Sequence, residues 1–544
     1  MIAPPNITFQ AFSNPSDNSK FWTHPNGKRY GVLVTDVPLG VLTISAWLKE
    51  KCAAEVRVID FNTEIHHSWH DAHAESFHEW FCSVLAAVKE SGFVPDLIGF
   101  SSLFITGYEN LIDLAGVAKA MFPEAFRICG GNLPTTMYQE LFEDAPEAFD
   151  ALCFGEGELA LTELMAAEDR KAYCDQSSQW ITLHNLKAGT VYQHKFIDEL
   201  DEIPYLDYSC IALQDYHRNP TIKAYTSVGN RTNYITFMGS RGCPFHCTFC
   251  SAHAVHGRKM RSFSIPRIEA ELTALSQTYS PNILVIEDDM FLWDNNWAAE
   301  VLKIAQKLNL VCFFPNALAL YALDRPMLEE LYRTGVRQLT LAVESGSERV
   351  LKQVMKKPLK LSITNRVVQD CHDLGIYTDC NIILGMPGET LEDIDDTREF
   401  LRGLNANWYR INVATPLAGS EMYIKAKEAG FIKGDIRLAG YKKCVVETND
   451  FSPGQIESIA YDINLEMNFL HNTDIKFGNY QRAKETFENV LTLRSDHALV
   501  MLKLIECKVG LGQVDDLPAM RQKLALMVRE SPFWTEYFRA HSLQ

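Results

Sequence analysis

Short hydrophobic runs alternate with amphipathic segments over the first 165 or so residues. The runs are rich in β-forming residues, whereas the segments between them repeat apolar positions every three or four residues, as helices do. The predicted strands cover 30–35, 56–60, 96–101, 126–129 and 149–154, and the predicted helices lie near 39–50, 72–90, 108–122, 135–144 and 157–168. β-α units in series predict a doubly wound α/β domain with a parallel sheet.

A second alternation begins near residue 233. Its predicted strands cover 233–240, 283–291, 311–316, 338–346, 377–389 and 409–420, and its predicted helices lie near 266–278, 294–308, 325–334, 361–375 and 389–403. Six β-α units predict a partial parallel (β/α)6 barrel with its site at the carboxyl ends of the strands.

The pattern after roughly residue 440 is helical. The motif Gly478-x-Tyr480 returns as Gly512-x-Val514, and the spacing of 512 − 478 = 34 residues is the tetratricopeptide period. One and a half repeats cannot bury a core of their own, so these helices are expected to pack on the barrel or to bind a protein partner. Ordinary helical hairpins remain the alternative.

Composition narrows the choice of partners. The chain has 544 residues, 47% of them hydrophobic, and 51 Lys and Arg against 69 Asp and Glu give a net charge of −18. No basic run and no apolar stretch of about 18 residues occurs, which argues against nucleic acid and against a membrane span. The absence of a leader pattern predicts a cytoplasmic protein, in which 14 cysteines do not form a disulfide framework.

Three cysteines stand close together after the strand predicted at 233–240. Cys243, Cys247 and Cys250 have C-x3-C-x2-C spacing, which would arise by chance about 0.01 times in a chain with 14 cysteines among 544 residues. A structural zinc site needs four ligands and usually a second Cys pair, which the sequence lacks. Three thiolates on a [4Fe–4S] cluster leave one iron open to a substrate. Zinc and a plain ferredoxin-like cluster remain the alternatives.

Small residues follow the strands of the first domain. Ligands of doubly wound sheets bind outside the carboxyl ends of the strands, and small residues there let the backbone approach a ligand closely. The residues at these ends are Pro38, Leu39, Ser101, Ser102, Gly130, Gly131, Gly155, Glu156 and Gly157.

These motifs together resemble one family. The cysteine triad with Phe249 before its third cysteine resembles the radical SAM motif, and residues 30–168 resemble the Rossmann-like, B12-binding domain of class B radical SAM enzymes. The resemblance implies a [4Fe–4S] cluster on the three cysteines and cobalamin at the nine residues named above. The Asp-x-His of His-ligated cobalamin domains is absent after Asp36, and the chain's Asp71-Ala72-His73 falls on a predicted helix, so no His ligand to cobalt is expected.

The resemblance also implies a site for S-adenosylmethionine (SAM). Phe249, Glu344, Ser345, Gly385 and Pro387 would contact SAM, with residues 385–389 forming the turn beneath the adenine. A carboxylate such as Glu344 suits an ammonium or ribose hydroxyls. Residues 287–289 would lie beside SAM or the substrate. Asn316 stands where relatives often have a basic residue, so no SAM contact is expected from it.

Four segments follow from these patterns. Residues 1–190 are the cobalamin-binding-like domain, 191–230 a linker, 231–440 the radical SAM core and 441–544 the helical region. Five histidines lie between residues 66 and 78 at helical spacings that could hold zinc, namely His66, His67, His70, His73 and His78. A solvated helix face is favoured because no Cys or carboxylate stands at a matching ligand position.

The resulting hypothesis is a cobalamin-dependent radical SAM C-methyltransferase. It would act on a small molecule or secondary metabolite through a 5′-deoxyadenosyl radical and methylcobalamin, with an electron donor such as flavodoxin or ferredoxin. A radical SAM enzyme that closes, contracts or rearranges rings is the alternative, and a non-catalytic iron–sulfur or zinc protein is a lesser one. tRNA methylthiolation is disfavoured by the acidic charge and by the lack of a basic RNA-binding module.

Overall fold

The structure is a computed structural model that describes residues 1–15, 21–23, 27–33, 36–70, 74–217 and 231–543. Packing divides the chain into two compact units. The first contains Met1–Pro15, Phe21–Arg337 and Pro416–Ala439, and the second contains Gln338–Thr415 and Gly440–Gln544. This division does not test the domain boundaries expected above, which stay predictions.

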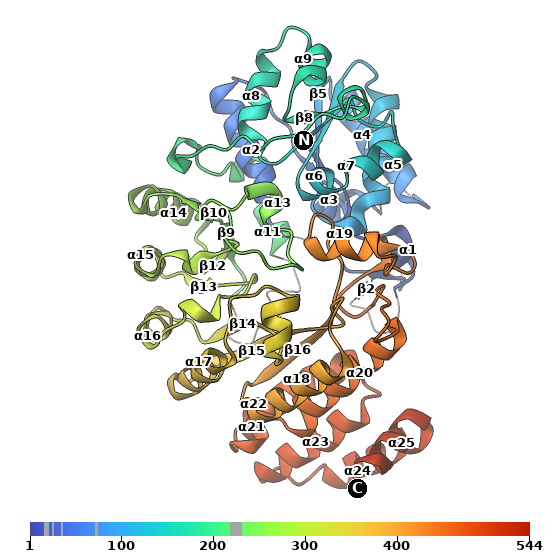
Figure 1. Cartoon of the computed structure of the whole chain (residues 1–544), viewed down its shortest axis with the longest axis vertical. Coiled ribbons are helices and arrows are strands. Elements are labelled where there is room, and N and C mark those ends of the chain that lie inside the picture. The colour runs from blue at the N-terminus through green and yellow to red at the C-terminus, as the bar shows by residue number, and fades with distance from the viewer. Residues whose placement is uncertain (16–20, 24–26, 34–35, 71–73, 218–230, 544) are drawn as a thin grey trace. The chain divides into compact units, whose positions relative to one another are not determined.

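A six-stranded sheet organises the N-terminal part of the first unit (Figure 1). Its strands, in spatial order, are β4 (Ile59–Asp60), β1 (Ile2–Ala3), β5 (Leu97–Ser101), β6 (Phe126–Gly130), β7 (Ala151–Cys153) and β8 (Trp180–Ile181). All neighbours pair in parallel except β7 and β8, which are antiparallel. The predicted doubly wound parallel sheet is confirmed, with one antiparallel edge strand.

The prediction of a sheet strand over 30–35 is wrong. Arg29–Gly31 forms β3, which pairs antiparallel with β2 (Phe21–Thr23), and residues 34–35 lie outside the described residues. The place between β4 and β5 belongs to Ile2–Ala3. Tyr30 is buried and stacks on Phe12 with ring centroids 4.9 Å apart, so the start of this hydrophobic run packs in a side cluster of aromatic residues.

Helices follow the strands as the periodicity predicts. They are α2 (Leu39–Lys51), α3 (Phe61–Ser68), α4 (Phe77–Glu90), α5 (Tyr108–Met121), α6 (Asn132–Thr136), α7 (Tyr138–Asp144) and α8 (Glu158–Ala166). In α4 the Ser76 hydroxyl accepts a hydrogen bond from the Glu79 N–H and so caps the helix. Trp80, Phe81 and Val84 bury one face of this helix, at the spacing of a single helical stripe.

The central strands form two three-stranded parallel sheets, one in each unit. In the first unit β9 (Tyr234–Phe237), β12 (Ile283–Ile286) and β13 (Val311–Phe313) lie beside helices α14 (Ile265–Tyr279), α15 (Asn295–Lys307) and α16 (Arg325–Arg333), drawn green to yellow in Figure 1. The second unit contains β14 (Gln338–Glu344), β15 (Tyr377–Leu384), β16 (Trp408–Val413), α17 (Leu361–Leu374) and α18 (Leu391–Gly403). All six predicted strands are confirmed.

The C-terminal region is helical, as predicted. Its longer helices are α20 (Pro453–Leu465), α22 (Tyr480–Leu493), α23 (Ala498–Gly510), α24 (Leu517–Glu530) and α25 (Pro532–Ala540). Consecutive helices from α22 onward pack on each other around Phe487 and Leu499. A Cβ on Gly510 would lie 2.6 Å from the Tyr480 ring, so α22 and α23 approach closely. Within the described residues, no helix combines the length and apolar character required to cross a membrane.

Candidate functional site

The loop that carries the three cysteines is closed at its base by two short strands. β10 (Ser240–Arg241) precedes the loop and pairs antiparallel with β11 (Arg261–Ser262), which follows it. Gly242 has φ of +97°, and a Cβ there would lie 2.4 Å from the Lys259 carbonyl oxygen, so this position requires glycine. The Cys243 N–H donates to the Gly257 carbonyl oxygen at 3.3 Å, which fastens the start of the loop.

The three cysteine side chains are similarly exposed to solvent. All three cysteines are half-buried, and the Ala252 N–H donates to the Cys250 sulfur at 3.4 Å. Burial raises the pKa of the Cys250 thiol to about 11, and negative charge at Asp289, Cys243 and Cys247 adds to the effect. Among the described residues, no three His, Cys, Asp or Glu side chains converge closely enough to hold a single metal ion. A [4Fe–4S] cluster takes each thiolate on a separate iron, so it does not require that convergence.

Residues 287–289, which follow β12, are acidic, and one of them binds the backbone and side chain that stand just before the cysteine loop. The buried Asp288 carboxylate accepts hydrogen bonds from the Gly239 N–H at 2.9 Å and the Ser240 hydroxyl at 2.5 Å. Burial raises the pKa of Asp288 to about 7 in spite of these bonds. Glu287 is also raised, to a pKa of about 8, by burial and by the negative charge of Asp36. The Asn316 amide donates to Glu287, at 2.9 Å to the carbonyl oxygen and 3.1 Å to the carboxylate.

Two of the predicted cobalamin loops meet at the carboxyl edge of the N-terminal sheet. Gly131 has φ of +112°, and a Cβ there would lie 2.5 Å from the Ser102 carbonyl oxygen. The Ser102 N–H donates to the Gly130 carbonyl oxygen at 3.1 Å, and Ser101 pairs with Gly130 in the sheet. The Ser102 hydroxyl oxygen and the Asn132 amide oxygen are buried without a hydrogen-bond partner in the described part of the chain.

A third loop joins this group through Thr135. The Thr135 hydroxyl donates to the Gly131 carbonyl oxygen at 2.7 Å and accepts from the Gly155 N–H at 3.2 Å. Gly155 has φ of +83°, and a Cβ there would lie 2.4 Å from the His194 Nδ1 atom. Pro38 and Leu39 stand half-buried at the start of α2, with Pro38 at its N-cap, and Gly157 is the N-cap of α8.

The Glu156 carboxylate is engaged in ion pairs. It lies 2.6 Å from Arg261, 2.8 Å from His256 and 3.2 Å from Arg241, all of which flank the cysteine loop. Burial alone would raise the pKa of this carboxyl, but Arg241 and the hydrogen bonds from His256 and Arg261 outweigh it and hold the pKa well below its usual range. These partners could not be predicted from the sequence, because 105 residues separate Glu156 from Arg261.

In the second unit, the predicted SAM residues at 344–347 form a tightly bonded turn. Glu344 has φ of +70°, rare for a residue with a side chain, and its buried carboxylate lies 3.3 Å from the Lys357 ammonium. Burial raises the pKa of Glu344, and Lys357 opposes that rise. The Ser345 hydroxyl lies 3.1 Å from the Thr397 hydroxyl, and a Cβ on Gly346 would lie 2.7 Å from the Thr397 Cα. Strained backbone of this kind clusters at functional sites.

Glu389 closes the second predicted SAM turn. Its Oε2 atom accepts hydrogen bonds from the Gly385 N–H at 2.6 Å and the Met386 N–H at 3.0 Å, whereas its buried Oε1 atom has no partner in the part of the chain that the structure describes. Gly385 has φ of +87°, while Pro387 is half-buried at the middle of the turn. Burial raises the pKa of Glu389 to about 7, although the two backbone hydrogen bonds oppose the rise.

Replacement of Glu389 by Gln is expected to change the pH dependence of stability. A carboxyl whose pKa rises from 4.5 to about 7 on folding stabilises the fold fully below pH 4.5, and this contribution is lost as the pH rises through about 7. The variant has no carboxyl to titrate, so wild type loses stability relative to it across that window, by at most about 1.4 kcal/mol per pH unit. Thermal-unfolding midpoints of both proteins at pH about 5, 6 and 8 measure this difference. A difference that stays constant with pH would contradict the assignment.

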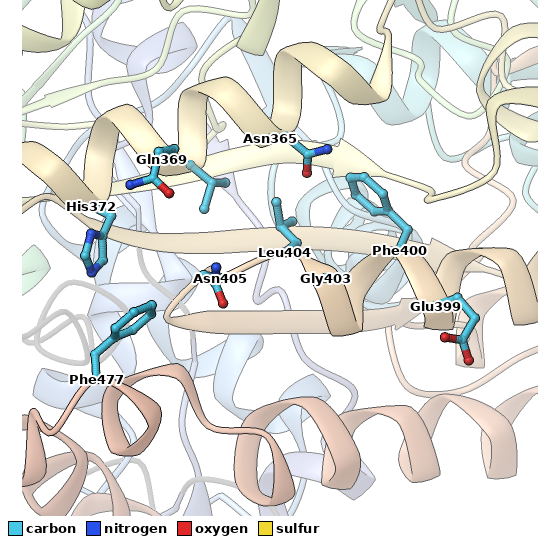
Figure 2. A pocket seen from close by; sticks show the side chains of 10 residues that line it. Asn365, Gln369, His372, Glu399, Phe400, Gly403, Leu404, Asn405 and Phe477 are labelled. Carbon is cyan, nitrogen blue, oxygen red and sulfur yellow. The ribbon is translucent and has the colours of Figure 1, made fainter.

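The second unit also contains a cavity of about 410 Å³. Figure 2 shows that its wall is formed by Asn365, Gln369 and His372 on one side and by Glu399, Phe400 and Asn405 on another. The His372 ring lies 4.7 Å from the Phe477 ring at one end. None of the predicted cofactor residues lines this cavity.

Two of the histidines between residues 66 and 78 pair with carboxylates. His67 lies 2.7 Å from Asp215 and His78 lies 2.6 Å from Asp113. Asp71, Ala72 and His73, which carry the chain's Asp-x-His, lie outside the described residues.

Comparison with known families defines the class of protein. Residues 34–165 match the B12 binding domain and residues 238–401 match the Radical SAM superfamily. The chain is therefore a radical SAM protein with an N-terminal B12-binding domain. These families assign it an iron–sulfur cluster, SAM and cobalamin as cofactors.

Individual relatives span most of the chain. Cytidylyl-2-hydroxyethylphosphonate methyltransferase of Streptomyces wedmorensis is 27% identical over 79% of this chain and 86% of its own length. Hopanoid C-3 methylase of Methylococcus capsulatus is 25% identical over 79% of this chain and 76% of its own length.

Two solved structures share the fold. The cobalamin-dependent SAM radical enzyme OxsB superposes with a TM-score of 0.64 at 14% identity, covering 94% of this chain and 73% of its own. The methyltransferase TsrM of Kitasatospora setae superposes with a TM-score of 0.56 at 16% identity, covering 78% of this chain and 82% of its own.

Proposed function

We propose that this chain is a cobalamin-dependent radical SAM methyltransferase that acts on a carbon atom of a small molecule. One observation carries the proposal. Within a single compact unit, the cysteine loop is bonded to a loop at the carboxyl edge of the B12-binding sheet, where Glu156 lies 2.6 Å from Arg261. The two cofactor-binding parts are thus held in contact. The relatives named as methyltransferases support the type of reaction.

The residues of the cysteine loop hold the cluster in this proposal. Cys243, Cys247 and Cys250 provide its three thiolates, and the β10–β11 pair fixes the two ends of their loop. Phe249 stands directly before the third cysteine and is half-buried, so its ring is available to pack against SAM. When bound, the reduced cluster supplies the electron that cleaves SAM, and cobalamin supplies the methyl group.

Residues of the second unit bind SAM in this proposal. The Glu344 carboxylate accepts hydrogen bonds from the ammonium or ribose hydroxyls of SAM, while Ser345 orders the turn through Thr397. Gly385 and Pro387 provide backbone against the adenine, in a turn that Glu389 keeps closed.

The carboxyl edge of the N-terminal sheet fits cobalamin. Ser102 Oγ and Asn132 Oδ1 are buried and have no hydrogen-bond partner among the described residues, and a polar atom left so costs about 1–3 kcal/mol. The amide groups on the rim of cobalamin offer hydrogen-bond partners for such atoms. Gly130, Gly131 and Gly155 keep the backbone bare at this edge, and the other predicted contacts come from Pro38, Leu39, Ser101, Glu156 and Gly157.

The proposal includes partners and a location. A low-potential electron donor such as flavodoxin or ferredoxin would reduce the cluster, and the C-terminal helices α22–α25 would bind any protein partner. No disulfide joins any two of the fourteen cysteines, all of which lie within the described residues, and this supports a reducing compartment such as the cytoplasm.

Labelled SAM tests the reaction type. The protein, reconstituted anaerobically with iron, sulfide and cobalamin, is given SAM with a labelled methyl group and a reductant. We expect labelled methylcobalamin and 5′-deoxyadenosine.

A ring-forming reaction is the second candidate, because an anaerobic magnesium-protoporphyrin IX monomethyl ester cyclase of Rubrivivax gelatinosus is 23% identical over 60% of this chain. Formation of 5′-deoxyadenosine without label on the corrinoid would favour that reaction, and absence of both products would leave only a non-catalytic cluster protein.

A further inference from the structure

Four buried charged side chains and the half-buried His256 connect the end of the B12-binding sheet to the cysteine loop. Glu156 and Glu158 come from the turn between β7 and α8, whereas Arg241, His256 and Arg261 come from the flanks of the loop. Arg261 makes two hydrogen bonds to Glu156, of 2.6 and 2.9 Å, and His256 makes one of 2.8 Å. Arg241 lies 2.8 Å from Glu158 and 3.2 Å from Glu156. We call this group the Glu156 clamp.

The clamp is sealed from solvent and balanced in charge. Side-chain exposure is 3% for Glu156, 4% for Glu158, 9% for Arg241 and 1% for Arg261. Two carboxylates face two guanidinium groups, and the half-buried His256 completes the group. Exposed ion pairs contribute little to structure, but a buried pair that loses one partner leaves an uncompensated charge in a medium of low dielectric. The four buried charges therefore stabilise the structure only as a complete set.

The clamp holds both ends of the cysteine loop. Arg241 stands two residues before Cys243, and His256 and Arg261 follow Cys250. Arg261 also donates to the Ile197 carbonyl oxygen at 2.9 Å and to the His256 carbonyl oxygen at 3.1 Å, and its guanidinium lies 4.5 Å from the Phe196 ring centre. The loop thus cannot change its path without moving a residue that is bonded to the B12-binding domain.

We infer that Glu156 and Glu158 are positioning residues for the iron–sulfur cluster, through which the B12-binding domain sets the geometry and the local charge of the cysteine loop. The inference rests on the proposed function, because it requires the cluster on Cys243, Cys247 and Cys250. Loss of one carboxylate leaves an unbalanced guanidinium at the base of the cysteine loop, where Arg241 stands two residues before Cys243. A positive charge there stabilises the more negative, reduced cluster, so its midpoint potential shifts to a more positive value.

The test uses the full chain, reconstituted anaerobically with iron and sulfide, in wild-type form and as Glu156→Gln and Glu158→Gln. We expect each variant to lose iron to a chelator about tenfold faster, as when an outer partner of a metal ligand is removed. The midpoint potential and the electron paramagnetic resonance spectrum of the reduced cluster shift as well. Glu156→Asp keeps the charge with a shorter reach, so its potential stays near the wild-type value while its iron is still lost faster.

Glu163→Gln is the matched control. Glu163 belongs to the same domain and pairs with Lys195 at 2.7 Å, but both side chains are about 40% exposed, so its removal should leave the cluster unchanged. Melting curves identify a variant that does not fold, and the Glu158 variant then decides, because within the described residues the ion pair of Glu158 is with Arg241. Folded variants with wild-type iron retention, potential and spectrum would overturn the inference and leave the proposed function intact. A wild-type chain that takes up no cluster would overturn both.

Discussion

Replacement of Cys243, Cys247 or Cys250 by Ala is expected to reduce reductant-dependent cleavage of SAM to the level measured without protein. Each thiolate is required, because the cluster needs three protein ligands to leave one iron open for SAM. The effect is therefore a complete loss rather than a reduction.

The measurement is the rate of 5′-deoxyadenosine formation, together with iron and sulfide per chain after reconstitution. Cys52→Ala and Cys82→Ala are matched controls, because both thiols are half-buried but lie in the N-terminal domain, outside the loop. They should keep the wild-type rate and iron content. A variant of the triad that cleaves SAM as wild type does, or a control that loses cleavage while still folded, would contradict the assignment of the cluster.

The central β-α units were predictable from sequence because their strands are buried on both faces. Every residue of β9 and β12 is buried, which produces a continuous hydrophobic run. The helices between them begin at side chains that cap the backbone: Ser264 before α14, Asp294 before α15 and Asp324 before α16. Hydrophobic period and capping residue agree at each boundary, so local information was sufficient.

The first strand was not predictable in the same way. Ile2–Ala3 pairs over two residues and is followed by Pro4 and Pro5, so it shows no alternation that a pattern could reveal. The run at 30–35 has the stronger β pattern, but its Tyr30 packs in an aromatic cluster with Phe12 and Trp69. Packing between distant segments decided which of the two segments entered the sheet.

The candidate site likewise has one part that was predictable from the sequence and another that was not. The spacing of Cys243, Cys247 and Cys250 is local, and so it was visible in the sequence. The partners that fix their loop are distant: Asp288 bonds to Gly239 across 49 residues, and Glu156 bonds to Arg261 across 105. The sequence pattern predicts Glu156 in the turn after the strand at 149–154, where the structure has it, but its ion pairs were not predictable, because periodicity carries no information about pairing over such separations.

Replacement of Gly131 by Ala is expected to weaken cobalamin binding by about tenfold or more. A residue with a side chain is strained by roughly 1–3 kcal/mol at φ of +112°, whatever space surrounds it. The added Cβ would also lie 2.5 Å from the Ser102 carbonyl oxygen, so the loops that carry Ser102 and Gly131 must separate. These loops form the predicted cobalamin contact. If the free protein can relax this strain and the cobalamin-bound protein cannot, about 1.4 kcal/mol of strain already lowers the affinity tenfold.

Bound corrinoid, measured from the absorption spectrum after anaerobic purification with cobalamin, reports the effect. Gly116→Ala is the matched control, since Gly116 lies in α5 with no atom within 4 Å of its added Cβ and is not at positive φ. Gly131→Ala should retain its iron, because the three atoms nearest the added Cβ all belong to Ser102, in the N-terminal sheet's own loop. Loss of both iron and corrinoid would indicate general misfolding, whereas wild-type corrinoid binding would place cobalamin away from the Ser102–Gly131 edge. We expect loss of corrinoid alone. That result would show that the cobalamin site can be disturbed without disturbing the cluster, although the Glu156 clamp connects the two sites.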